Sequence, residues 1–403
     1  MSMSSSTFGG FICGLVSGVV ASALSAMPTG TVASLAVASC TAGMLVATPF
    51  AGCLATAMGT KCAVKVALSL LAASGPLFFI ASPEGVTLLS ARFMQGASLG
   101  FLYVLFPLQL SETLPPERRG RGMGLFQFFL LGGQVTGAVY GMLLTNLIGV
   151  SPSLWRIAFA TPTLPALMLT LPLVNRNSST AADEVARENP KCHPASEPPT
   201  TGELRRLCLA VTMLAFCSAI GIGPVTNFTV RIMHGAGVTG ISANSIDIAM
   251  QTLAMAATFL GAHASDAIGR RRTLISGIAG CLVALLLLTM ATNSQASTML
   301  VATSLMLFSA SYAFGPGVCC WLMLCEIMPS RIRASGMSLA LLANHAVSVF
   351  IAASFAPAAE TFGLSTVFAT LFSASLVFLV LVILFLPETN GAEIRASTHR
   401  TSS

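Results

Sequence analysis

Acidic and basic side chains recur in one motif that occurs twice in the chain. The pattern Glu-x-x-Pro-x-x-x-Arg runs from Glu112 to Arg119 and again from Glu326 to Arg333, with 214 residues between the two starts. Each copy follows a long apolar run and precedes another. A carboxylate beside apolar surface is costly unless a cation pairs with it, and a guanidinium group is a suitable partner. The motif therefore predicts acid–base pairs at the ends of apolar segments.

A second charged pattern precedes each copy of the first. In the second half it reads Gly-x-x-x-x-Asp-x-x-Gly-Arg-Arg and contains Asp266, Arg270 and Arg271. The first half has a weaker version, from Gly52 to Lys61, at an offset of 210 residues measured from Gly59 to Gly269. Two patterns that repeat in one order at nearly one offset predict two structurally equivalent halves.

The composition is typical of a polytopic helical membrane protein. Hydrophobic residues make up 54% of the chain and charged residues only 8%, whereas a soluble domain carries about 25% charge. The net charge of +6 comes from Lys and Arg in short loops, which indicates membrane topology and not a nucleic-acid partner. Most of the cysteines lie inside apolar runs without metal-ligand spacing, so we expect no metal site and no cofactor.

Twelve apolar runs are long enough to span a bilayer. They cover residues 7–26, 32–57, 63–82, 87–111, 120–147, 155–174, 207–230, 240–265, 273–293, 298–325, 334–356 and 363–386. Basic residues concentrate in alternate loops, which predicts that both termini lie in the cytosol. We expect a six-helix bundle over 1–174, a polar cytosolic linker over 175–206, a second bundle over 207–390 and a cytosolic tail over 391–403.

The repeated charges have two interpretations. They could form a network that holds helix ends together in one conformation and releases them in another. They could instead only anchor loops at the membrane surface; the repetition favours the network. Its predicted members are Glu112, Arg119, Asp266, Arg270, Arg271, Glu326 and Arg333. The first-half pattern has Thr56 where the second has Asp266, so we expect a weaker network in the first half and a larger loss of function in Arg333→Ala than in Lys61→Ala.

Several motifs together resemble the sugar porter family of the major facilitator superfamily. The second half carries the Gly261–Arg271 pattern, Gly315-Pro-Gly317, the Glu326–Arg333 pattern and Pro387-Glu-Thr-Asn-Gly391. The first half carries Ala91-Arg92-Phe93 and Trp155-Arg156. The resemblance implies an all-α fold of twelve transmembrane helices in two pseudo-symmetric six-helix bundles. It also implies a cavity between them that opens to alternate sides, and a sugar bound by amide and aromatic side chains.

Four residues match cavity positions of this family. Gln127 and Gln134 lie seven apart on one face of the fifth span, and an amide can both donate to and accept from a sugar hydroxyl. An alternative is that they bond neighbouring helices. Trp321 lies in mid-span, where an indole can cover a sugar ring, and Asn344 matches a family cavity residue. Trp155 opens the sixth span and is interpreted as an interfacial anchor.

The chain also departs from the family pattern. Span 7 reads Cys217-Ser218 and Gly223 where the family usually has a Gln pair and an Asn, and span 10 has Ala313 in place of an acidic residue. Asp247 and Gln251 lie one turn apart in the eighth span and could replace part of the missing polarity. The alternative is that Asp247 lies near the outer surface and is solvated.

Energy coupling and function follow from the same comparison. No Asp or Glu precedes Glu84, so the first span lacks the carboxylate that proton-coupled sugar porters carry, and the buried Arg92 lacks its usual acidic partner. We expect facilitated diffusion of a hexose or similar solute across the plasma membrane. Proton symport, transport of another solute (a polyol, an organic ion or a drug) and a transport-inactive nutrient receptor remain alternatives. No nucleophile–base or phosphate-loop pattern is present, so an enzyme is not expected.

Overall fold

A computed structural model describes residues 3–82, 85–113, 116–149, 151–168, 200–238, 241–293, 298–328 and 333–388. Within these ranges the chain is helical, and eleven segments are long and apolar enough to cross a membrane. They correspond to eleven of the twelve expected spans. The remaining one, expected at 155–174, is described only as far as residue 168.

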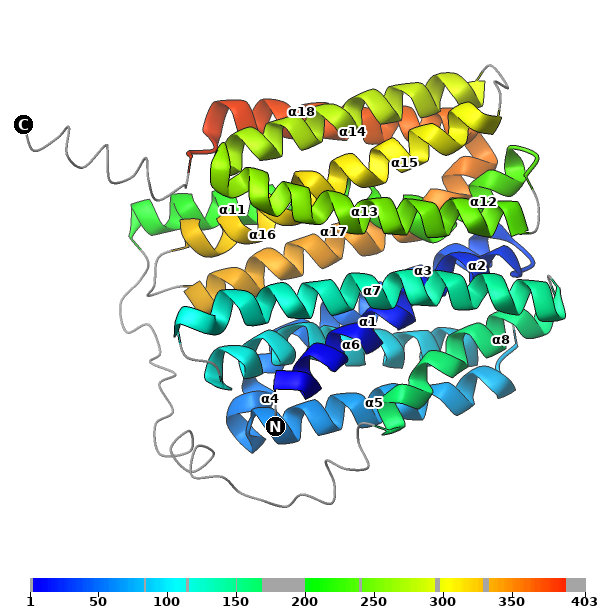
Figure 1. Cartoon of the computed structure of the whole chain (residues 1–403), viewed down its shortest axis with the longest axis horizontal. Coiled ribbons are helices and arrows are strands. Elements are labelled where there is room, and N and C mark those ends of the chain that lie inside the picture. Colours follow the sequence, from blue (N-terminus) through cyan, green and yellow to red (C-terminus); the bar gives the residue numbers. More distant parts are fainter. Residues whose placement is uncertain are drawn as a thin grey trace, which may run out of the picture. The chain divides into compact units, whose positions relative to one another are not determined.

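The described helices of the first half follow the order expected from the apolar runs (Figure 1). They are α1 (Met3–Gly18), α2 (Val20–Ser25), α3 (Gly30–Ala47), η1 (Thr48–Phe50), α4 (Ala51–Met58), α5 (Thr60–Ile80), α6 (Val86–Thr113), α7 (Pro116–Ile148), α8 (Pro152–Ala160) and η2 (Thr161–Thr163).

The helices of the second half repeat this order. They are α11 (Thr201–Ala219), α12 (Ile222–Gly235), α13 (Ile241–Ala267), α14 (Arg270–Asn293), α15 (Thr298–Phe314), α16 (Pro316–Ile327), α17 (Arg333–Phe362) and α18 (Leu364–Phe385). The first span of each half is broken into two helices, between α1 and α2 and between α11 and α12. Interrupted helices at matching positions are typical of transporters built from repeats.

The 210-residue offset also appears in the backbone. Gly59 and Gly269 both adopt positive φ angles, of 82° and 101°. Each glycine lies between two helices and directly precedes the first residue of the second one, Thr60 of α5 and Arg270 of α14. A residue with a side chain rarely adopts such angles, so a glycine at each of these two positions allows a tight turn in both halves.

The chain forms two compact units. The first comprises Met1–Pro194, Asn227–Gln251 and Ala352–Pro357, and the second comprises Ala195–Thr226, Thr252–Ile351 and Ala358–Ser403. The C-terminal part of α12, the start of α13 and a short part of α17 thus pack with the first-half helices. Most of the linker expected at 175–206 lies outside the described residues.

Two glycine stripes bring α1 and α7 into close contact. Gly14 faces the backbone of Leu130 and Gln134, and Gly133 faces the backbone of Phe11. A Cβ atom at either glycine would collide with main-chain atoms. Small residues at four-residue spacing let membrane helices approach to backbone contact. This packing fixes α7, which carries both glutamines predicted to bind substrate.

Candidate transport site

The two predicted glutamines of α7 differ in exposure. Gln127 is exposed and Gln134 is half-buried. The main chain of Gln134 lies against Gly14 and Gly18 of α1, so the position of its side chain is set by the α1–α7 contact. The two side chains share one helical face. Among the described residues, neither side-chain amide has a hydrogen-bond partner.

The second unit contains a polar cluster at the position where the family's span-7 amides are missing. The thiol of Cys217 lies 3.2 Å from the Tyr312 hydroxyl. The Ser348 hydroxyl donates to the Ser218 hydroxyl over 2.9 Å, and the Asn344 amide donates to the Leu214 carbonyl over 2.9 Å. These bonds connect α11 to α15 and α17. The Asn344 amide therefore uses a donor in a bond to a neighbouring helix.

Sequence reasoning missed Tyr312 and Ser348. Tyr312 is one of three tyrosines in the chain and directly precedes Ala313, the position where the family has an acidic residue. That position and the scarcity of tyrosine are the signals that could have identified it. Ser348 lies one turn after Asn344, and nothing in the sequence distinguishes it from the many other serines in apolar runs.

The two tryptophans occupy different environments. Trp321, on α16, is 45% exposed, which leaves its indole available to a ligand. Trp155 is fully buried in the first unit, and the guanidinium of Arg156 lies 5.1 Å from its ring centroid. The expectation that Trp155 is an interfacial anchor is therefore wrong: its ring packs inside the protein.

Asp247 is a buried carboxylate in the first unit. Its side chain is only 1% exposed, and its Oδ1 atom accepts no hydrogen bond from the described residues. Gln251, one turn later and half-buried, is the polar side chain beside it. The interpretation of Asp247 as a solvated surface residue does not hold in this conformation. Burial of a carboxylate without a cation is costly, and such groups in membrane helices are usually functional.

Several hydrogen bonds join the first half of the chain to α12, α13 and α17 within the first unit, and three of them illustrate the pattern. The Ser22 hydroxyl donates to Asn244 Oδ1 over 2.7 Å. The guanidinium of Arg231 donates to the Thr29 carbonyl over 3.3 Å, and the backbone N–H of Ala356 donates to the Ser34 hydroxyl over 3.2 Å. These bonds lie at the helix ends that are opposite to the repeated charge motifs. On α13, for example, Asn244 is near the first residue and Asp266, which belongs to a charge motif, is near the last.

The charge network of the second half centres on Arg270. Its Nε donates to Glu326 Oε1 over 3.2 Å, and its Nη2 lies 3.3 Å from Asp266 Oδ1. Arg270 is 15% exposed, Glu326 31% and Asp266 74%. The contact with Glu326 joins α14 to α16, whereas the contact with Asp266 lies within one turn of chain and is screened by solvent.

Arg270 and Arg271 also contact groups outside the predicted network, and one of these groups, Glu388, was not predicted to take part. The Glu388 carboxylate accepts hydrogen bonds from the backbone N–H groups of Arg270, over 2.9 Å, and Arg271, over 3.2 Å. It therefore caps the N-terminus of α14, where the helix dipole favours an anion. The Arg271 guanidinium donates to the carbonyls of Val382 and Ile383 on α18, and its side chain contacts no carboxylate among the residues that the structure describes.

The remaining predicted members cannot be assigned partners. Glu112 lies in the last turn of α6, Arg119 in the first turn of α7, and Arg333 is the first residue of α17. Their side chains lie outside the described residues. The sequence signal for Glu388 was its position in Pro387-Glu-Thr-Asn-Gly391, a motif used for the resemblance but given no structural role.

Arg92 is buried with neutral partners. Its side chain is 2% exposed. Nε donates to the Ala36 carbonyl over 3.2 Å, Nη1 donates to Gln95 Oε1, and the guanidinium lies 4.4 Å from the ring centroid of Phe159. A carbonyl, an amide and a ring face satisfy this cation without a carboxylate, as the sequence predicts from the missing acidic partner.

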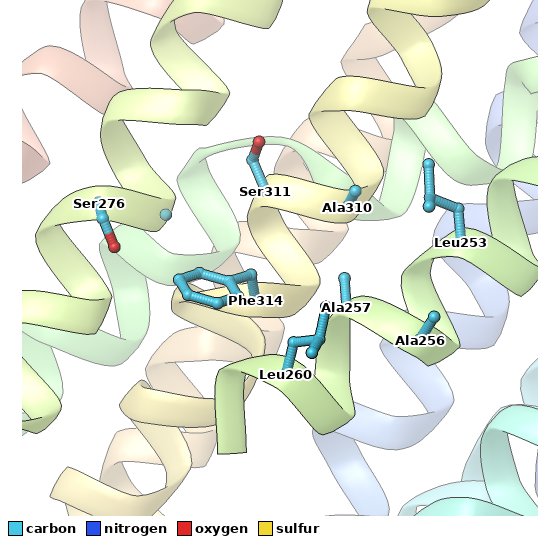
Figure 2. Close-up of a pocket in the computed structure, with 9 residues that line it drawn as sticks. Leu253, Ala256, Ala257, Leu260, Ser276, Ala310, Ser311 and Phe314 are labelled. Atoms are coloured by element: carbon cyan, nitrogen blue, oxygen red, sulfur yellow. The ribbon is translucent and has the colours of Figure 1, made fainter. Parts of the chain in front are cut away.

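A groove of about 350 Å³ on the second unit is unlike the predicted binding site. Figure 2 shows its lining on α13, α14 and α15, which includes Leu253, Leu260 and Phe314. Ser276 and Ser311 supply the hydroxyl groups of the lining. None of the residues predicted to bind substrate lines it. A groove of this composition cannot satisfy the hydroxyls of a sugar.

The fold agrees with that of a solved transporter. The inward-open structure of the xylose transporter XylE from E. coli superposes with a TM-score of 0.81, covers 96% of each chain and shares 20% of its residues. Together with the repeated halves and the apolar helices, this similarity shows that the chain is an integral, multi-pass membrane protein with the fold of that transporter.

The family is defined by sequence. The model of the family described as sugar (and other) transporter matches residues 5–188 and 174–398. The D-xylose-proton symporter-like 2 of Arabidopsis thaliana is 26% identical over 369 residues, 80% of this chain and 73% of that protein. The facilitated glucose transporter protein 1 of Caenorhabditis elegans is 25% identical over 405 residues, 90% of this chain and 78% of that protein. The chain belongs to the sugar (and other) transporter family and works by alternating access.

Proposed function

We propose that the protein carries a hexose or a similar polyhydroxylated solute by facilitated diffusion. The substrate class is supported by the relatives, which are described as a xylose symporter-like protein and a glucose transporter. It is also supported by Gln127 and Gln134 on one face of α7 and by the exposed indole of Trp321. Amides match sugar hydroxyls, and an indole matches the apolar face of the ring.

The single observation that carries the uniport proposal is the environment of Arg92. This buried cation is satisfied by Ala36, Gln95 and Phe159, and no Asp or Glu occurs before Glu84. A carboxylate that titrates during transport must lie where conformation changes its surroundings. Within the part of the chain that the structure describes, the partners of Arg92 include no such carboxylate.

The test is labelled-hexose uptake by the purified protein in liposomes, with and without a proton gradient at clamped voltage. Uniport predicts equilibration to the external concentration at the same rate under both conditions. Accumulation above the external concentration, driven by the gradient, would contradict it. A panel of pentoses, hexoses, polyols and organic ions as competitors would define the substrate class.

Proton symport through Asp247 is the second candidate. The observation that favours it is a nearly fully buried carboxylate with an oxygen that accepts no hydrogen bond from the described residues. If Asp247 binds the coupled proton, Asp247→Asn abolishes gradient-driven accumulation while it preserves exchange of labelled sugar at equal concentrations. If the protein is a uniporter, the same variant changes neither the driving force nor the final level of uptake.

The charge network is proposed to be a latch at the cytosolic ends of the helices. Arg270 joins α14 to α16 through Glu326, and Glu388 joins the chain after α18 to α14. Both termini are proposed to lie in the cytosol and the protein in the plasma membrane, because the basic residues concentrate in the corresponding loops. Labelling of single cysteines with an impermeant reagent in intact and permeabilised cells tests this orientation.

A further inference from the structure

A second groove lies between α11 and α18 of the second unit and encloses about 290 Å³. On each helix the lining residues recur at three- and four-residue spacing, so each helix contributes one continuous face. The lining consists of Arg205, Cys208, Leu209, Thr212 and Met213 on α11 and Phe378, Leu381, Val382, Phe385 and Leu386 on or just after α18.

The groove is polar at one end and apolar along the rest of its length. Arg205 is its charged lining residue and lies in the second turn of α11, beside the end of α18. Met213 lies eight residues further, which is about 12 Å along the helix. The lining residue Phe378 stacks on Phe216, which follows Met213 by three residues, with ring centroids 6.0 Å apart.

The charge of Arg205 is not neutralised by the described residues. Its side chain is exposed and has no hydrogen bond or ion pair among them. The two carboxylates nearest in the chain to the groove walls are engaged elsewhere: Glu203 caps its own helix through Thr200, and Glu388 caps α14. Arg271 adds a second cation to this end, where it donates to the carbonyl of the lining residue Val382.

We propose that this groove binds an anionic phospholipid of the surrounding bilayer. The phosphate lies against Arg205 at the membrane–water interface, and one acyl chain lies along the apolar faces of α11 and α18. An apolar slot with Arg205 in its lining and Arg271 beside the same end matches this amphiphile, because basic side chains near the surface attract anionic headgroups. A sugar does not match the groove, since its apolar lining would leave most hydroxyls without partners.

Cys208 is a native cysteine whose rate of alkylation can report whether the groove is occupied. It lines the groove and is exposed, and Cys62 is an exposed thiol on α5 that serves as an internal reference. The protein is reconstituted in nanodiscs of phosphatidylcholine with an increasing share of phosphatidylglycerol of identical acyl chains. Alkylation by the uncharged reagent N-ethylmaleimide is followed at both cysteines by peptide mass spectrometry. The proposal predicts that phosphatidylglycerol slows alkylation of Cys208 several-fold relative to Cys62.

The matched variants are Arg205→Gln and Arg206→Gln. Both residues are exposed, but only Arg205 lines the groove. In Arg205→Gln the share of phosphatidylglycerol that gives half-maximal protection of Cys208 is expected to rise about fivefold, the effect of one basic residue near an anionic surface. Arg206→Gln should leave it unchanged, and Arg205→Lys should restore most of the preference.

Three outcomes would overturn the proposal. Equal protection of Cys208 by both lipids would show a groove that does not select for charge. An unreactive Cys208 in pure phosphatidylcholine would show that another segment of the chain covers the groove. Equal shifts in Arg205→Gln and Arg206→Gln would show that the effect reflects overall surface charge and not this site.

Discussion

Arg270 Nε lies 3.2 Å from Glu326 Oε1, and this contact joins the first turn of α14 to the last turn of α16. The two residues are 56 positions apart in sequence and belong to the two charge motifs that repeat along the chain. The repeated motifs are therefore not independent loop anchors in the second half: one supplies the cation and the other the carboxylate. Changes that separate this pair should alter the balance between transporter conformations.

The first prediction concerns this pair. Arg270→Gln and Glu326→Gln should each slow hexose uptake, and the double variant should be no slower than the worse single variant, since the second change removes a partner that is already lost. A partly exposed pair contributes about 0.2–1 kcal/mol, so each loss should be up to about fivefold. Uptake rates in proteoliposomes measure it, with Asp266→Asn as the control. Full additivity of the two single effects would contradict the pairing.

The second prediction concerns the cap supplied by Glu388. Glu388→Gln should lower the apparent melting temperature of the purified protein, because the backbone N–H groups of Arg270 and Arg271 lose a charged acceptor at the start of α14. The cost should be about 1 kcal/mol, the usual value of a helix N-cap. Asp266→Asn removes a negative charge from the same turn without removing the cap. An equal decrease in both variants would indicate a general charge effect.

The third prediction concerns the glycine contact between α1 and α7. Gly133→Ala should destabilise the protein strongly, because its new Cβ would collide with the Phe11 carbonyl. Gly132→Ala is a sensitive control, since a Cβ there meets nothing within 4 Å. It should be neutral or stabilising by up to about 1 kcal/mol through helix propensity. Thermal unfolding and the yield of monodisperse protein distinguish them. Equal behaviour of the two variants would mean that α1 and α7 are not in backbone contact.

The fourth prediction concerns substrate binding. Gln127→Ala and Gln134→Ala should each weaken sugar affinity about tenfold, because each removes an amide that we propose to bond sugar hydroxyls, and those hydroxyls would then lack a partner. Thr136→Ala is the control on the same helix, since its exposed hydroxyl bonds only the Gly132 carbonyl of its own helix. The apparent KM for uptake measures the effect. An unchanged KM in both glutamine variants would remove α7 from the binding site.

Some features of the fold were predictable because they depend on local chemistry. Apolar runs of span length predicted the order of the helices, and the motif offset measured from Gly59 to Gly269 predicted two structurally equivalent halves. The resemblance also predicted that Arg92 lacks its usual acidic partner, and the partners of Arg92 among the described residues are neutral. In contrast, Trp155 was misplaced: amphipathic rings often lie at the interface, but here the ring packs in the core.

The sequence alone predicted a helical membrane protein of two repeated halves, and the resemblance of its motifs to the sugar porter family predicted a transporter. A chain with so many apolar and so few charged residues must place its apolar segments in a bilayer. Charged motifs that repeat at one offset indicate a repeated structure. Only the tertiary structure decided which group each polar side chain contacts. Glu388 caps a helix 118 residues away in sequence, and Cys217 meets Tyr312 across 95 residues. Such partners depend on how helices pack, and the packing is set by close backbone contacts that composition and spacing do not specify.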